Sequence, residues 1–333
     1  MDAEALHKDA IVMDAAAPLL REYRYIDDYI AGGVDILVPT VCTNDNAAAA
    51  LATIAGWHDH VRGDARLSFV SSVADILAAK KTGQTAVILH AQGADLLENN
   101  VQLVDAFKAL GVGIMQLAYN EKNRLGDGAG ERTDAGLSIF GVKVVNRCNE
   151  VGIVVDGSHT GNRTTLDAIE ISAKPFVFSH ANPKGVFDTA RNITDEQIKA
   201  CAATGGVIGA VGYPAFVSAS ERPNLDQYID HIAYVADLVG IAHVSLGVDY
   251  FLGHAGIADD ARAIREYEGR INVGRWRRSD YPPPPYYYPE GIETPDKLGN
   301  LTAALLRRGF AADDVRAVLG GNWMRVLTQC WGA

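Results

Sequence analysis

The chain has 333 residues, of which 48% are hydrophobic and 21% are charged, and 30 basic against 41 acidic residues give a net charge of -11. This composition is typical of a globular protein and argues against a nucleic-acid partner, because binding phosphates requires clustered lysine and arginine. The acidic first residues and the lack of a long apolar run predict no signal peptide, no membrane partner and a cytoplasmic location. The four cysteines are widely spaced without a CxxC pair, which predicts free thiols.

Short apolar runs, rich in Val and Ile, alternate with longer segments that have helical spacing. The runs are Ile11–Met13, Ile36–Thr40, Thr85–Leu89, Val112–Ala118, Gly152–Val155, Phe176–Phe178, Val207–Gly212 and Val244–Gly247. The segments between them include Asn99–Leu110, Thr194–Ala203 and Leu225–Val239. Parallel strands covered by helices have this pattern, and its eightfold repetition predicts one (β/α)₈ barrel domain over residues 1–333. A doubly wound open sheet is the alternative, which the lack of a GxGxxG motif after the first run disfavours.

Residues Arg270–Lys297 interrupt the alternation, because they include four consecutive prolines and the tyrosines Tyr286–Tyr288. Such a run excludes a helix interior or a central strand. We expect a long loop after the eighth strand, either over the mouth of the barrel or as a surface arm or oligomer contact. Its aromatic residues, with Trp276, would offer ring faces suited to a cationic ligand.

Polar residues follow the strands, at the end of a barrel that carries function. His90, His159 and His180 lie at such ends, and Gln92 follows His90 by two residues. Imidazoles on neighbouring strands are suited to binding zinc. The candidate metal ligands are therefore His90, His159 and His180, together with Gln92. The alternative for each histidine is a hydrogen-bonded, half-buried residue.

Asp249 ends the last strand and is the candidate general base, with a helix N-cap as the alternative. Tyr119 is the second candidate catalytic residue, as a donor to a developing oxyanion. Arg191 is expected to clamp a substrate carboxylate, with a surface salt bridge as the alternative. The further candidate substrate-binding residues are Asn120, Tyr213 and His254.

Several stretches together resemble the membrane dipeptidase (renal dipeptidase, peptidase M19) family of amidohydrolase-like barrels. They are Leu110–Leu117, Gly136–Gly141, Val155–His159, Pro175–His180, Ala190–Asn192, Gly205–Val207, Leu246–Asp249 and Gly320–Asn322. The resemblance implies a two-zinc (β/α)₈ barrel that hydrolyses dipeptides and related small amides, commonly as a homodimer. It also implies that His159 and His180 match metal ligands, Asp249 the acid that handles the catalytic water, and Arg191 the substrate-binding arginine.

The sequence departs from this family at one side of the implied site. Ala16 and Pro18 stand where the family has a His-x-Asp pair, Gln92 replaces the bridging glutamate, and Tyr119 replaces a substrate-binding histidine. Losing three ligands should abolish one metal, so we expect one zinc ion or none. The chain therefore resembles a divergent branch of the family.

Three functions are compatible with these residues. The first is a dipeptidase-like hydrolase of a small amide or dipeptide-like metabolite, with one divalent metal or a degenerate metal site. The second is a repurposed, metal-free enzyme for a non-peptide small molecule such as a lactam, a lactone or a lyase substrate. The third is a non-catalytic protein that binds a small molecule on an old enzyme scaffold.

Overall fold

A computed structural model describes residues 2–254 and 260–332 of the chain. The strands in this part are β1 (Met13–Ala17), β2 (Ile36–Cys42), β3 (Leu67–Phe69), β4 (Thr85–Val87), β5 (Leu89–Ala91), β6 (Val112–Gln116), β7 (Val154–Asp156), β8 (Phe176–Val177), β9 (Ile208–Ala210) and β10 (Val244–Leu246). The helices are α1 (Ala3–Asp9), α2 (Ile26–Ala31), α3 (Ala47–Gly63), α4 (Val73–Thr82), α5 (Leu103–Ala109), α6 (Ile139–Val151), α7 (Asn162–Ile171), α8 (Asp195–Ala203), α9 (Pro214–Val217), α10 (Leu225–Val239), α11 (Asp260–Asn272), α12 (Gly299–Arg307), α13 (Ala312–Arg316) and α14 (Asn322–Trp331).

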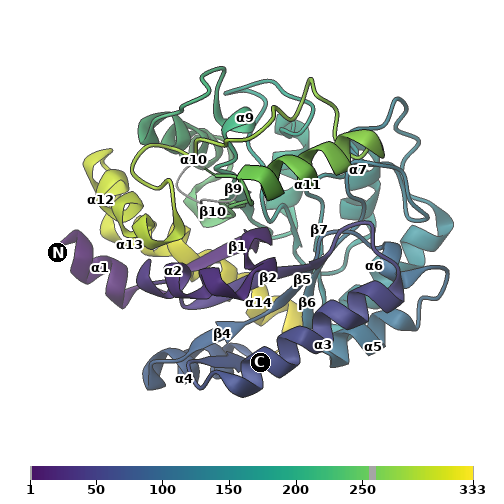
Figure 1. The fold of residues 1–333 in the computed structure, drawn as a ribbon, viewed down its shortest axis with the longest axis horizontal. Helices are drawn as coiled ribbons and strands as arrows, with labels where there is room; N and C mark the ends of the chain where they lie inside the picture. Colours follow the sequence, from purple (N-terminus) through teal and green to yellow (C-terminus); the bar gives the residue numbers. More distant parts are fainter. Residues whose placement is uncertain (1, 255–259, 333) are drawn as a thin grey trace.

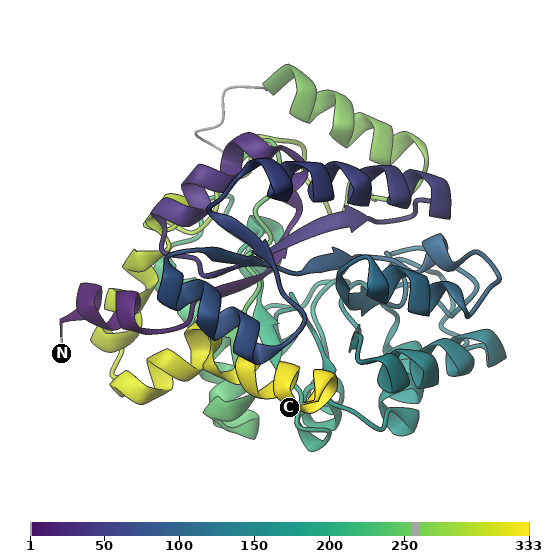
Figure 2. The ribbon, with the colours of Figure 1, turned by 90° about the horizontal axis from the view of Figure 1, so that it is seen from below.

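The strands form a closed parallel barrel with helices outside it, which confirms the predicted fold class (Figure 1). β1 pairs with β2, β2 with both β4 and β5, and the ladder continues in order from β5 to β8. A parallel bridge between Phe178 and Ile208 links β8 to β9, which pairs with β10. The ring closes where the Asp249 N–H donates to the Ala16 carbonyl at 3.2 Å. Figure 2 shows the strands at the centre with helices on several sides.

The eight predicted runs all contribute to the barrel, with three differences. The first strand, β1, lies later than the run Ile11–Met13, and the two share only Met13. The run Thr85–Leu89 is divided at Ile88 into β4 and the start of β5, because β2 pairs with each of them separately. An additional strand, β3, pairs with β4 outside the ring. Only Leu67 of β3 is buried, so the apolar pattern that reveals a central strand is missing there.

Local sequence signals set the helix boundaries near the site. Thr194 and Asn224 cap α8 and α10, and each forms a capping box with a glutamine three residues later, Gln197 or Gln227. α10 ends at Gly240, whose φ of 94° is readily accessible only to glycine. These caps determine where each helix starts and ends relative to the strand beside it.

The barrel interior is filled by apolar side chains at the end opposite the polar strand ends. One buried cluster joins strand residues with residues of α14, and it includes Met13, Ile36, Val38, Ile88, Ile114, Val154, Val177, Trp323 and Val326. α1 packs against α12 and α13, so the first and last parts of the chain lie side by side (Figure 1). The functional end of the barrel is thereby left to the polar residues after the strands.

The predicted loop 270–297 starts later than expected, because α11 continues to Asn272. Arg270 is thus a helical residue in the last turn of α11. The following segment is irregular up to a short 3₁₀ turn at Pro295–Lys297, and it buries Trp276, Tyr281, Tyr286 and Tyr288.

Two further features bear on the protein's environment. All four cysteines are buried and free, as expected. Every helix in the described ranges is too short or too polar to span a bilayer.

Candidate active site

The carboxyl ends of the strands surround a narrow space, called here the inner cavity. Its lining includes Pro18, Arg21, Thr40, Thr43, Gln92, Tyr119, His159, Tyr213, Phe216, Asp249, Phe251, Arg270, Trp276 and Tyr281. Retained and changed positions of the implied family site therefore face one space. Trp276 and Tyr281 come from the segment after α11, so this segment forms part of the cavity wall.

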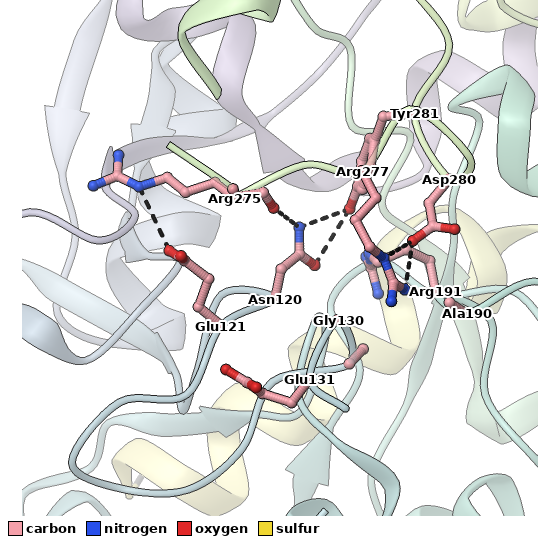
Figure 3. Close-up of a pocket in the computed structure, with 12 residues that line it drawn as sticks. Asn120, Glu121, Gly130, Glu131, Ala190, Arg191, Arg275, Arg277, Asp280 and Tyr281 are labelled. Atoms are coloured by element: carbon pink, nitrogen blue, oxygen red, sulfur yellow. Dashed lines mark hydrogen bonds and ion pairs between the residues drawn. The ribbon is translucent and has the colours of Figure 1, made fainter. Parts of the chain in front are cut away.

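A second space, the outer cavity, is larger and shares Tyr281 with the inner one. Figure 3 shows Asn120 between Tyr281 and the backbone of Arg275, with Arg191 near Arg277 and Asp280. The Asn120 amide donates to the Tyr281 hydroxyl at 3.0 Å and to the Arg275 carbonyl at 3.2 Å. Asn120 therefore ties the segment after α11 to the end of β6.

The His159 imidazole is oriented by Asn120, whose Oδ1 lies 2.8 Å from His159 Nδ1. The Asn120 amide nitrogen donates to Tyr281, so Asn120 Oδ1 accepts a hydrogen bond from the N–H at His159 Nδ1. The lone pair of the His159 ring therefore lies on Nε2. Tyr119 stacks on the same ring at a centroid distance of 4.1 Å. The Tyr119 hydroxyl accepts from Trp276 Nε1 at 3.3 Å, and no described residue accepts its proton.

The His180 imidazole lies 4.8 Å from that of His159, measured between ring centroids. Its Nδ1 lies 2.8 Å from Ser179 Oγ, which donates to Asp156 Oδ2 at 2.5 Å. Because the Ser179 hydroxyl donates its hydrogen bond to Asp156, His180 Nδ1 must carry the N–H and donate to Ser179 Oγ. The His180 lone pair therefore also lies on Nε2, an atom with no described partner. Burial and the charge of Arg191 hold the pKa of both imidazoles well below 6.5, so both are neutral.

Asp156 is the common hydrogen-bond acceptor for the residues around His180. Its carboxylate accepts from both the backbone and the hydroxyl of Ser158 and Ser179, and from His90 Nε2 at 3.1 Å. Burial works to raise its pKa, but the hydrogen bond and charge of His90 outweigh it and the pKa is lowered. His90 is thereby directed at Asp156, and its Nδ1 has no described partner.

Asp249 is half-buried and lines the inner cavity, and desolvation by its surroundings raises the pKa of its carboxyl to about 8 against the opposing charges of Arg191 and Arg270. Asp14 is a buried acid nearby, and burial raises its pKa to about 7. Asp14 Oδ1 accepts from the Val248 N–H at 2.7 Å, so the two acids are connected through one backbone step. An acid with a pKa near neutrality is suited to proton transfer.

These two acids predict a pH-dependent stability. Each stays protonated in the fold while the unfolded chain ionises it at its ordinary pKa of 3.8. The native state then binds more protons than the unfolded state between about pH 4 and pH 8, so the free energy of unfolding falls as pH rises through this window.

In Asp14→Asn one of the two contributions is gone, and we expect a shallower decline. Urea unfolding at several pH values in this window measures the slope for both proteins. Slopes that are equal in wild type and variant would contradict the assignment of Asp14.

Arg191 is 4% exposed, and its Nε and Nη2 are buried without a described hydrogen-bond partner. Its guanidinium lies 5.3 Å from the Phe216 ring, and it lines the outer cavity. The surface salt bridge considered from the sequence is absent among the described residues, since no described carboxylate pairs with Arg191. A buried guanidinium without a partner is suited to binding an anionic ligand.

The remaining predicted residues differ in their placement. Gln92 lines the inner cavity, with its side chain close to the Asp249 carboxyl. Tyr213 also lines it, with its hydroxyl close to that of Tyr286. His254 lies outside the described lining of both cavities and bonds the Phe251 carbonyl at 3.1 Å, while burial lowers its pKa to about 4.

Sequence reasoning missed Arg270, which lines the inner cavity from α11. The sequence pattern places Arg270 in the predicted loop 270–297. An arginine in a polar helix also gives no local signal of a functional position. The guanidinium lies 5.0 Å from the Trp276 ring and 5.1 Å from the Phe251 ring. The protein's own cation thus covers ring faces that we had expected to suit a cationic ligand.

Three positions of the left-handed backbone region lie in this site. Asn120, His159 and Asp249 have φ values of 59°, 59° and 62°, and the described chain has one other non-glycine residue with positive φ, Glu98. Side chains with a Cβ are strained in this region. The surrounding hydrogen bonds and packing hold these three residues in place.

The metal centre implied by the family resemblance fits these residues only in part. No group of three or more His, Cys, Asp or Glu side chains in residues 2–254 and 260–332 is arranged to hold a metal ion. Ala16 and Pro18 offer no ligand atoms on their side chains, and the neutral Gln92 amide is a poor bridge between two cations. The two Nε2 lone pairs of His159 and His180 are suited to one ion, but the donors for a second are missing.

Comparison with known proteins places this site in context. A sequence profile described as membrane dipeptidase (peptidase family M19) matches residues 27–269. An uncharacterized dipeptidase of Schizosaccharomyces pombe is 30% identical over 71% of this chain and 51% of its own length. A dipeptidase of Claviceps purpurea is 25% identical over 79% of this chain, and the chain spans about half the length of these curated relatives.

Two solved structures are also similar to this chain. An amidohydrolase from Pseudomonas aeruginosa matches all of both chains with a TM-score of 0.88 and 32% identity. A metallopeptidase from Rhodobacter sphaeroides, solved with a phosphinate mimic of the dipeptide L-Ala-D-Ala, matches 97% of this chain and all of its own with a TM-score of 0.80 and 20% identity. The latter likeness supports the fold alone.

Proposed function

Since the chain belongs to the membrane dipeptidase (peptidase M19) family of hydrolases, we propose that it hydrolyses a small amide or dipeptide-like molecule that carries a carboxylate. The observation that carries this proposal is the buried, unpartnered guanidinium of Arg191 next to Asp249 and two neutral imidazoles. A planar guanidinium binds a carboxylate through two parallel hydrogen bonds. The substrate would thus be fixed by its acid group with its amide near the proton-transfer residues.

The chain's own residues divide the chemistry among them. Asp249 takes a proton from the attacking water and can return it to the leaving amine, since its pKa of about 8 lies near neutral pH. The Tyr119 hydroxyl, whose proton has no described acceptor, donates to the oxygen on which negative charge develops. Tyr119, which stacks on His159, and Trp276, which stacks on Tyr281, exclude water from one side of the inner cavity.

One zinc ion or none is the metal content that the donor atoms support. His159 and His180 would hold the ion through Nε2, and a bound zinc ion would supply Lewis acidity and an activated water. The two-metal centre of a dipeptidase is not part of the proposal, because Ala16, Pro18 and Gln92 replace its other ligands.

A repurposed, metal-free enzyme is the second candidate, and a specific observation favours it. The changed positions Pro18, Gln92 and Tyr119 line the inner cavity itself, so they alter the surface that a substrate touches. The same acid–base residues could then act on a lactam, a lactone or a lyase substrate. A non-catalytic binding protein has less support, because Asp249 lines the inner cavity with a pKa near neutrality.

A panel of dipeptides and N-acyl amino acids, each paired with its carboxamide, tests the proposal. We expect hydrolysis of the free acids and at least about tenfold slower hydrolysis of the carboxamides, because these cannot form the charged pair with Arg191. Elemental analysis of the same preparation should give at most one zinc ion per chain. The proposal fails if no member is hydrolysed with or without added zinc, and two firmly bound ions would contradict the metal assignment.

A further inference from the structure

Arg270 is a half-buried cation that lines the inner cavity and has no part in the proposed hydrolysis. Its guanidinium carbon lies 5.0, 5.1 and 6.0 Å from the ring centroids of Trp276, Phe251 and Tyr119. Three rings hold the planar group by cation–π contacts and restrict its orientation. Its Nη1 is buried with no described hydrogen-bond partner, and no described carboxylate pairs with it.

Arg191 and Arg270 lie at two adjoining spaces. Arg270 lines the inner cavity, whereas Arg191 lines the outer cavity and lies over the Phe216 ring, which lines the inner one. The charges of both also act on Asp249 and His159. Asp249 is the only acid among the described lining of the inner cavity, and Arg21, the other arginine there, is 3.5 Å from Asp45. Two guanidinium groups thus remain without a partner carboxylate among the described residues.

Buried, unpaired charges destabilise a fold by several kcal/mol unless a ligand satisfies them. One carboxylate on a substrate can satisfy Arg191, but it leaves Nη1 of Arg270 unpaired. Two arginines with unpaired nitrogen atoms, one at each of two adjoining cavities, are therefore suited to a molecule with two anionic groups.

We propose that the substrate is a dicarboxylate, an amide or dipeptide-like molecule that contains an acidic residue, with one carboxylate on Arg191 and the other on Arg270. This inference rests on the proposed function for the amide bond, but not for the recognition of the two charges. Arg270 is a specificity residue in this arrangement: its aromatic surroundings preset the guanidinium plane, so little conformational entropy is lost on binding.

Calorimetric titration with dicarboxylates that cannot be hydrolysed tests the inference. The probes are succinate, glutarate and adipate, each compared with its monoamide, which keeps the size and removes one charge. At least one diacid should bind wild-type protein about 10- to 100-fold more tightly than its monoamide, because a hydrogen bond to a charged group contributes this much. In Arg270→Gln this preference should fall to about threefold or less, with the affinity for the monoamide unchanged.

Two further variants serve as controls. Arg62→Gln removes an exposed arginine of α3 that pairs with Asp59, and it should keep the full preference. Arg270→Lys keeps the charge and should keep part of the preference, which separates loss of charge from a fold defect if thermal unfolding of Arg270→Gln is altered.

The outcomes separate this inference from the proposed function. If no amide in the panel is hydrolysed but the preference for a diacid depends on Arg270, hydrolysis is wrong and the dianion site stands. If amides are hydrolysed but no diacid binds better than its monoamide, or the preference survives in both Arg270 variants, the dianion site is overturned.

Discussion

Replacing Asp249 by asparagine should lower kcat by about 10²- to 10⁴-fold, the contribution that a positioned general acid–base group makes. The variant keeps the size of the side chain, and asparagine tolerates the left-handed backbone at this position, where φ is 62°. The loss should therefore reflect proton transfer and leave the fold intact. Steady-state kinetics on the best substrate of the panel measure it, with thermal unfolding as the check on folding.

The pH dependence of kcat/KM gives a second test of the role of Asp249. The base form of Asp249 is the ionised one, and burial raises its pKa to about 8, so kcat/KM of wild type should rise with pH up to about pH 8. Asp188→Asn is the matched control, because Asp188 is an exposed aspartate that pairs with Lys184 at the surface. A variant at Asp249 with wild-type kcat, or a profile without a rise toward pH 8, would remove Asp249 from the mechanism.

Replacing Asp156 by alanine should lower the free energy of unfolding by about 3–5 kcal/mol, as expected when one partner of a buried charged network is removed. The carboxylate is fully buried, and it accepts hydrogen bonds from Ser158, Ser179 and His90. Their donors would be left unsatisfied in the interior. Denaturation by urea or guanidinium at neutral pH gives the change directly.

Exposed pairs provide the comparison for Asp156. Asp188→Ala removes one side of an exposed pair, and it should change stability by less than about 1 kcal/mol. Ser179→Ala removes one donor to Asp156 and frees Nδ1 of His180, so an intermediate loss is expected. An Asp156→Ala loss as small as that of Asp188→Ala would show that the network does not support the barrel.

The barrel was predictable from sequence because its strands are buried on both faces. β2 and β6 are apolar throughout or nearly so, and α10 begins and ends at the predicted residues. β3 could not be found in this way, since Ser68 and Phe69 are only partly buried. A short strand that pairs outside the ring leaves no repeated apolar signal.

The residues of the site likewise fall into those that the sequence could predict and those that it could not. His159, His180 and Asp249 follow strands directly, and all parallel strands end at one face of a barrel, so their proximity could be expected from chain order. Arg270 belongs to a helix that follows the last strand at a distance, and its position depends on how α11 packs. The partners that orient the imidazoles, Asn120 and Ser179, likewise depend on tertiary geometry that periodicity does not contain.

The three left-handed residues at the mouth have a consequence for protein engineering. Each such backbone costs about 1–3 kcal/mol for a residue with a Cβ, and glycine would relieve it. A programme that selects only for thermal resistance would thus favour glycine at Asn120, His159 and Asp249, and would remove the side chains that orient and transfer protons. In this barrel, positions where glycine would relieve backbone strain are also positions whose side chains the proposed activity needs.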